Sequence, residues 1–157
     1  MIAGSGERVT LRQVARSADA CNIMQIDPFG GGLLSPEAVA NKLAVLHRHC
    51  DEIGRPFETV LRTYTTGWTI LAKDERALQA KLARYFPDGI EQRYQGTWRD
   101  YVFHATPDRA VVHFRALIEA GIQYFIVETM DAMDHDTIRL LATDVIPAIR
   151  MAARQRG

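Results

Sequence analysis

Runs of buried-strand residues alternate with amphipathic helices along the chain, and this alternation limits the possible folds more than any other feature. Residues 18–24, 59–72 and 122–128 are rich in the apolar, β-branched and aromatic residues that form buried strands. A helix is expected after each run, and another precedes the first at about residues 8–17. With right-handed crossovers between parallel strands, the sequence predicts an α/β fold of about four βα units.

The later helices carry clear start signals. Ser35-Pro36-Glu37 and Thr106-Pro107-Asp108 each combine a capping side chain, a proline at the first helical position and an acid in the first turn. Asp74 caps a further helix that is expected to end at Pro87. The helix after Ser35 is expected to bury Val39, Leu43, Leu46 and Cys50. The last helix, from about residue 136, is expected to bury Ile138, Leu141, Val145 and Ile149.

Two stretches are expected to be irregular. Residues 25–32 combine Pro28 with a run of glycines that ends at Gly32, which favours a loop that covers a site or spans a gap. Residues 87–105 are expected to pack over a barrel end or against a partner subunit. Their aromatic side chains are Tyr94, Trp98, Tyr101 and Phe103.

The chain opens with Met1-Ile2-Ala3, followed directly by the turn Gly4-Ser5-Gly6-Glu7 and the first helix. In α/β folds a Gly-Ser-Gly turn leaves the end of a strand and opens a helix, so that backbone N–H groups and the helix dipole face an anion. The turn is either a phosphate-binding turn or simply a tight βα connection. Because so little strand precedes it, we expect the chain to start within a βα unit.

Composition excludes several classes of function. The 157 residues, 47% of them hydrophobic, suit a single domain over residues 1–157. With 19 basic and 19 acidic residues, no positive field exists to bind nucleic acid. No apolar run reaches the roughly 20 residues that span a bilayer, and no signal peptide is evident, so we expect no membrane partner and a cytoplasmic location. Cys21 and Cys50 lack CxxC spacing and are expected to be reduced, buried thiols.

The architecture that fits best is a (β/α) barrel of the TIM type. No GxGxxG motif supports a Rossmann half. A complete barrel has about eight strands and about 250 residues. The sequence therefore predicts about half a barrel.

Three segments carry a resemblance to a known family. They are residues 2–22, residues 49–56, and residues 105–108 leading through Ala120-Gly121 to residues 145–147. In order and spacing they are similar to the C-terminal half of the bacterial-luciferase-like monooxygenases, especially the branch that uses the deazaflavin F420. The resemblance implies a TIM barrel, of which this chain supplies the end of strand five through helix eight.

The resemblance also implies a cofactor and its site. In the family, the turn after the fifth strand binds the phosphate of F420 or FMN, which transfers here to Gly4, Ser5, Gly6, Glu7 and Arg8. The implied activity is hydride transfer or monooxygenation. In the family, strands one to four form most of the wall around the cofactor ring and the substrate. Because this sequence does not contain them, no catalytic residue is carried over.

Three functional hypotheses stay open. The first is an oxidoreductase in which two copies of the chain pair and close an eight-stranded barrel. The second is a non-catalytic, truncated half-barrel that self-associates. In the third, a different polypeptide completes the barrel.

An acidic cluster follows the last strand at the barrel face where active sites lie. It comprises Asp131, Asp134, His135 and Asp136. These residues suit a hard metal ion or a general base, but the same residue types cap a following helix and solvate a loop. Capping is the favoured interpretation, and no metal site is predicted.

The remaining candidates favour structural roles. His47 and His49 are two residues apart on a helix, so their side chains point to different faces and do not share a metal ion. Tyr64 and Trp68 lie on one side of their strand and are expected to be core residues. No serine, cysteine or lysine stands in a recognisable nucleophile motif.

Overall fold

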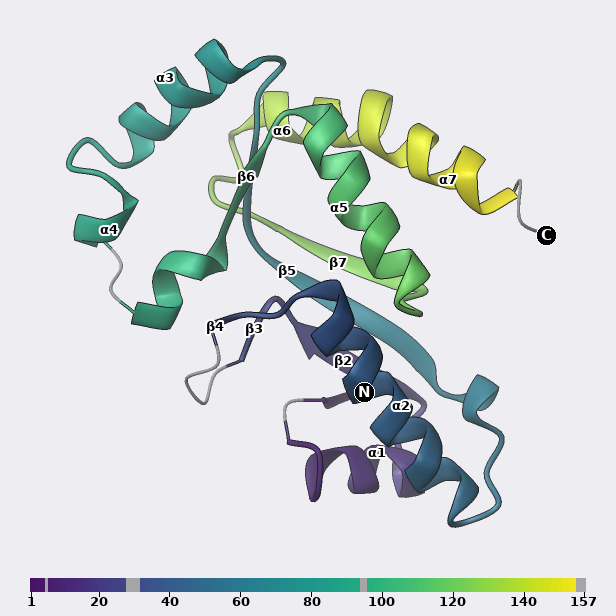
Figure 1. Ribbon diagram of the computed structural model, residues 1–157. Helices are drawn as coiled ribbons and strands as arrows, with labels where there is room; N and C mark the ends of the chain where they lie inside the picture. Colours follow the sequence, from purple (N-terminus) through teal and green to yellow (C-terminus); the bar gives the residue numbers. More distant parts are fainter. Residues whose placement is uncertain (5, 28–31, 94–95, 155–157) are drawn as a thin grey trace. The chain divides into compact units, whose positions relative to one another are not determined.

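Parallel strands alternate with helices in the computed structural model, which has a mixed α/β fold (Figure 1). The structure describes residues 1–4, 6–27, 32–93 and 96–154. The chain divides into two units. Unit 1 holds Met1–Thr66 and Leu117–Ile126, and unit 2 holds Gly67–Ala116 and Val127–Gly157.

Unit 1 is built on three parallel strands with β2 in the middle. Strand β1 (Ile2–Ala3) pairs with β2 (Ala20–Met24), which pairs with the first part of β5 (Leu61–Leu71). The connecting elements are α1 (Thr10–Ser17), the antiparallel strands β3 (Ile26–Asp27) and β4 (Gly32–Leu33), α2 (Pro36–Asp51) and the 3-10 turn η1 (Phe57–Thr59). Part of the 25–32 segment is thus a short hairpin and not only a loop. Its residues 28–31 lie outside the described part of the chain.

The core of unit 1 lies between its sheet and its helices. Cys21 and Ile23 on β2 and Tyr64 on β5 are buried in one cluster with Leu11 of α1. The predicted stripe of α2 is confirmed, because Val39, Leu43, Leu46 and Cys50 are all buried. Helix α2 begins as expected, since the Ala38 N–H donates to Ser35 Oγ at 3.2 Å. The core position expected for Tyr64 is also confirmed.

Both cysteines are free and buried, as the sequence predicts. Burial, with a smaller contribution from nearby Cys50, raises the pKa of Cys21 to about 11. The Cys21 thiol therefore stays protonated at neutral pH and acts as a small apolar core group.

Unit 2 contains the last part of β5 and strand β6 (Val102–Ala105). They pair in parallel, from Trp68 opposite Val102 to Leu71 opposite Ala105. Strand β7 (Tyr124–Thr129) begins in unit 1, ends in unit 2 and pairs with β5. The other elements are α3 (Glu75–Tyr85), α4 (Ile90–Arg93), the 3-10 helix η2 (Gly96–Tyr101), α5 (Pro107–Glu119), α6 (His135–Leu140), the π-helical turn η3 (Leu141–Val145) and α7 (Ile146–Arg154).

Strand β6 corrects the expectation that residues 87–105 are irregular throughout. Four residues are too few to show a clear alternation, and both Phe103 and His104 are half-buried. The half-buried Trp68 makes an edge contact with Tyr101 at 5.5 Å between ring centroids and packs on the core of unit 2. Tyr94 and the side chain of Trp98 lie outside the described residues.

The last helix buries a different face from the one predicted. Ile138 is 45% exposed, whereas Thr137 and Leu140 are buried. A π-helical turn interrupts the helix at Leu141–Val145 and changes the angular spacing of the following residues. Of the predicted stripe, only Val145 is fully buried.

Strand β7 is not the buried strand that the sequence predicts. None of its residues is fully buried, and Tyr124 is 57% exposed. An apolar run shows that a segment is able to be buried, but not that the described chain covers it. No helix within the described ranges is long and apolar enough to cross a membrane.

Candidate functional site

The first candidate site is the turn that follows β1. Gly4 is buried beside β2, and its N–H donates to the Asn22 carbonyl oxygen at 2.6 Å. A Cβ at this position would lie 2.7 Å from Cys21 Sγ and 3.3 Å from Leu11 Cδ2. Close packing therefore explains the glycine, and its N–H is already occupied. Ser5 lies outside the described residues.

The rest of the turn is more open. The Gly6 carbonyl accepts from the Leu11 N–H at 2.9 Å, and Glu7 and Arg8 are exposed. Helix α1 starts at Thr10, two residues later than expected, and no side chain caps it. Among the described residues, no acceptor lies within hydrogen-bonding distance of the Glu7 and Arg8 N–H groups. This geometry leaves two backbone donors and a guanidinium beside a helix start.

His49 supports the turn from α2. Its Nε2 lies 3.1 Å from the Glu7 carbonyl oxygen, and its Nδ1 lies 3.2 Å from Glu52 Oε2. His47 instead stacks on Phe57, with ring centroids 4.5 Å apart. The prediction that the two histidines point apart is confirmed. The contact of His49 with Glu7 spans 42 residues, so no local pattern in the sequence indicates it.

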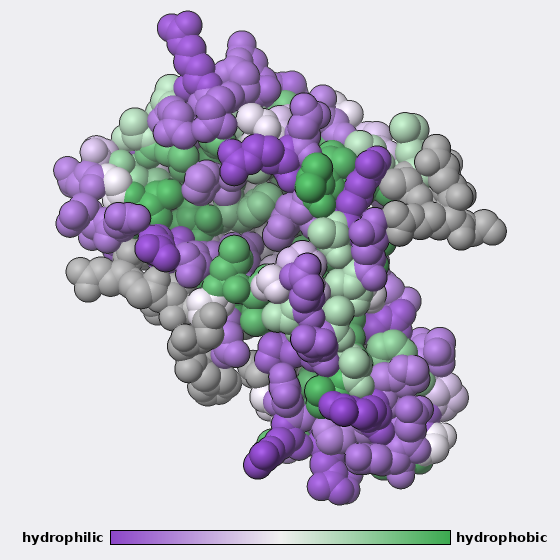
Figure 2. All heavy atoms as spheres, in the orientation of Figure 1, coloured by the Kyte–Doolittle hydropathy of each residue, from purple (hydrophilic) through white to green (hydrophobic). Residues whose placement is uncertain are grey.

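Beside this contact lies an open depression between the turn and the outer face of α2. Its lining residues are Glu7, Asn41, Ala44, Val45, His47, Arg48 and Asp51. Acidic and basic groups both contribute, and the surface over α1 and α2 is mostly hydrophilic in Figure 2. The mixed charge gives the depression itself no preference for an anion.

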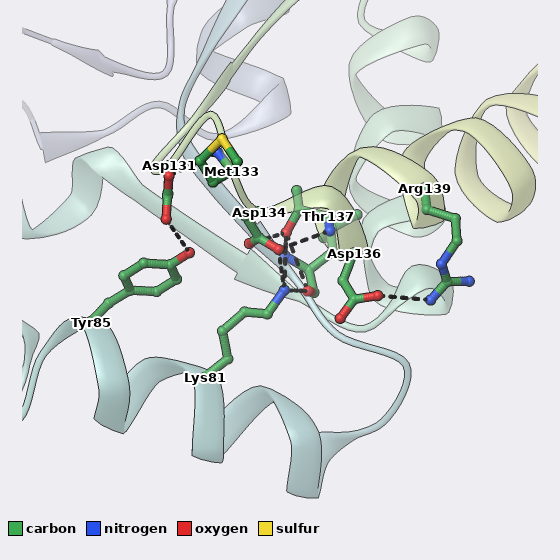
Figure 3. Close-up of polar contacts among 9 residues, drawn as sticks. Lys81, Tyr85, Asp131, Met133, Asp134, Asp136, Thr137 and Arg139 are labelled. Atoms are coloured by element: carbon green, nitrogen blue, oxygen red, sulfur yellow. Dashed lines mark hydrogen bonds and ion pairs between the residues drawn. The ribbon is translucent and has the colours of Figure 1, made fainter.

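The acidic cluster after β7 acts as a helix cap and an ion-pair partner (Figure 3). Asp134 Oδ1 accepts from the Thr137 N–H at 3.1 Å, which confirms the capping interpretation. Lys81 extends from α3 and donates to Asp134 Oδ1 at 2.7 Å and to the Leu71 carbonyl at 2.8 Å. Asp131 accepts from the Met133 N–H at 2.8 Å.

These contacts leave little capacity for a metal. Asp134 is nearly buried, and both of its oxygens accept hydrogen bonds. Among the described residues, no group of three or more His, Cys, Asp or Glu side chains is arranged to hold a metal ion. The cluster joins α3, the end of β5 and the start of α6 within unit 2.

The Asp134 carboxylate makes stability depend on pH. Burial alone raises its pKa, but hydrogen bonds from Lys81 and Thr137 and the charge of Lys81 outweigh burial, so the pKa of Asp134 is lowered. Because the folded pKa lies below the unfolded value of about 3.9, the ionised group stabilises the fold above that pH. The stabilisation is lost as the pH falls through the folded pKa.

We therefore expect the melting temperature of the wild type to fall more steeply than that of Asp134→Asn between about pH 5 and pH 2. Circular dichroism melts across this range measure both slopes. Equal slopes for the two proteins would show that Asp134 does not contribute this pH dependence.

Comparison with known proteins finds solved structures that share this fold. A scan against models of protein families finds no match, and a search of curated proteins finds no relative. Solved structures do match. The EDTA monooxygenase of Chelativorans sp. BNC1 is 14% identical, with a TM-score of 0.72 over 96% of this chain and 46% of that one.

Two further structures show the same relationship. The F420-dependent tetrahydromethanopterin reductase of Methanopyrus kandleri is 16% identical, with a TM-score of 0.62 over 94% of this chain and 50% of that chain. The oxygenating constituent of 3,6-diketocamphane monooxygenase from Pseudomonas putida, solved with FMN, is 16% identical with a TM-score of 0.62. That match covers 94% of this chain and 48% of that one.

This chain has a half-size luciferase-like fold. The matching structures are luciferase-like monooxygenases and F420-dependent oxidoreductases, so the resemblance seen in the sequence is confirmed at the level of the fold. The chain spans about half the length of these structures. Within the described ranges the luciferase-like sheet is open, because β1 pairs only with β2.

Proposed function

We propose that this chain is the phosphate-binding half of a luciferase-like oxidoreductase that uses F420 or FMN. The observation that carries the proposal is the match over nearly the whole chain to structures named for F420-dependent enzymes or solved with FMN. The turn Gly4-Ser5-Gly6-Glu7 and Arg8 follows the first strand of this half and precedes its first helix. A bound cofactor of this kind supplies hydride transfer or oxygen activation.

The residues of the turn suit a phosphate. The Glu7 and Arg8 N–H groups provide backbone donors beside the helix start, and the exposed Arg8 guanidinium supplies positive charge. His49 holds the turn through the Glu7 carbonyl. Ser5 adds a hydroxyl donor by resemblance to the family. The chain's own part is to anchor and orient the cofactor.

The open sheet supports a second element of the proposal, which is barrel completion by a second copy of the chain. Among the described strands β1 pairs only with β2, and such an open edge favours pairing with another chain. The main sheet of one copy has five strands, so two copies supply more than the eight strands that a barrel requires. If a different polypeptide completes the barrel instead, that polypeptide will co-purify with the chain from its native cells. If the half-barrel is non-catalytic, the assembled protein will bind no cofactor.

Arg8→Ala tests the phosphate site. We expect the dissociation constant for FMN to rise by about tenfold, because one charge-assisted hydrogen bond to phosphate is lost. Quenching of flavin fluorescence during titration measures the constant, and a parallel titration uses F420.

Arg16→Ala is the matched control, because Arg16 is an exposed arginine in the last turn of α1, the helix that follows the turn. It should bind FMN as the wild type does. Equal affinities of Arg8→Ala and Arg16→Ala for FMN would show that Arg8 does not bind the phosphate. A wild type that binds neither FMN nor F420 would overturn the cofactor proposal.

A further inference from the structure

Asn22 is a polar residue on the sheet face opposite the core of unit 1. Its neighbours Cys21 and Ile23 point into that core, so the alternation of the strand directs Asn22 to the other face. Thr63 lies directly opposite Asn22 on β5, and Thr65 is the next residue of β5 on the same face. The side chain of Asn22 is half-buried, whereas both threonines are buried.

The two threonines fix the orientation of the Asn22 amide. Thr63 Oγ1 donates to Asn22 Oδ1 at 2.8 Å, which is closer than its other acceptor, the Cys21 carbonyl oxygen at 3.2 Å. Thr65 Oγ1 donates to the same Asn22 Oδ1 at 3.0 Å. These bonds use both lone pairs of Oδ1, which leaves only the two Nδ2 hydrogens of the side chain to interact. Among the described residues, no acceptor lies within hydrogen-bonding distance of Nδ2.

This donor lies beside the phosphate-binding turn. Ala3, the last residue of β1, is the partner of Asn22 in the sheet. The next residue, Gly4, donates its N–H to the Asn22 carbonyl oxygen at 2.6 Å. A molecule anchored by phosphate at the turn therefore has the Nδ2 donor within reach of its remaining part.

We propose that Asn22 Nδ2 donates a hydrogen bond to a ring carbonyl of the bound flavin-type cofactor, with Thr63 and Thr65 holding the amide in place. The inference rests on the proposed function. A group that only donates, fixed by two buried hydroxyls, suits the carbonyl oxygens of the pyrimidinedione ring that FMN and F420 share. Asn22 thus binds the ring, and the turn binds the phosphate.

The isosteric variant Asn22→Asp tests the contact. It replaces the Nδ2 donor by a second oxygen, so we expect weaker binding of FMN and of riboflavin, which has no phosphate, by about tenfold in each case. Arg8→Ala should weaken the binding of FMN but not the binding of riboflavin. Thr65→Val keeps Asn22 but removes one of the two hydrogen bonds that orient its amide. We expect the affinity for both ligands to fall about threefold.

Gln13→Glu is the matched control, since it makes the same amide-to-carboxylate change at an exposed position of α1. It should leave both affinities unchanged. Melting curves establish that each variant is folded, and Thr65→Val carries the test if Asn22→Asp does not fold. The inference is overturned if the folded variants bind riboflavin like the wild type while the wild type binds FMN. If the wild type binds no flavin at all, the proposed function itself fails.

Discussion

Gly67→Ala is expected to prevent unit 2 from reaching its native packing. Gly67 lies within β5, and a Cβ built on it would overlap the Tyr101 carbonyl group, which belongs to the rigid backbone at the end of η2. A backbone carbonyl does not rotate away as a side chain does, so strand β6 would have to move off β5. We expect a loss of more than about 3 kcal/mol in the free energy of unfolding.

Gly89→Ala provides the matched control in the same unit. Gly89 has a φ of +88° and no atom within 4 Å of an added Cβ, so this variant incurs only the backbone cost. That cost is about 1 kcal/mol. Urea unfolding followed by circular dichroism measures both variants. Similar losses at the two positions would contradict the close approach of Tyr101 to Gly67.

Lys81→Met is expected to destabilise unit 2 nearly as much. Asp134 is 4% exposed and Lys81 is 16% exposed, so the variant leaves a buried carboxylate without its counter-charge. The Leu71 carbonyl oxygen also loses a donor. Removal of one member of a buried ion pair costs about 3–5 kcal/mol, far more than the pair contributes relative to an apolar replacement.

Two further variants show whether the loss of stability comes from the unpaired buried charge or from the change to methionine itself. Lys73→Met makes the same change at an exposed lysine and should alter the free energy of unfolding by no more than about 0.5 kcal/mol. The double variant Lys81→Met/Asp134→Leu removes both charges and should recover part of the loss. If Lys81→Met and Lys73→Met have the same free energy of unfolding, the ion pair does not hold α3 to α6.

Sequence alone predicted the elements whose signals are local. Helix α2 begins at the Ser35 cap and buries the expected stripe, and the eleven residues of β5 fall within the predicted strand. Strand β6 is too short for its alternation to be seen, and the π-helical turn before α7 has no composition that marks it. Local periodicity therefore decides what the sequence reveals.

The sites follow the same rule. The Gly4-Ser5-Gly6 turn is visible in the sequence, but the packing of Gly4 against Cys21 needs the neighbouring strand. The contact of Thr63 with Asn22 joins residues 41 apart, and that of Lys81 with Asp134 joins residues 53 apart. Such pairs leave no spacing pattern, because folding alone brings them together.

We propose above that two copies of this half-size chain assemble and bind a flavin-type cofactor. Sedimentation velocity with FMN or F420 present, recorded at both protein and cofactor absorbance, tests it most directly. We predict that cofactor absorbance sediments with a species of twice the 17.7 kDa mass of one chain. The claim would be contradicted if the protein sedimented with the mass of one chain and all cofactor absorbance sedimented at the rate of free FMN or F420.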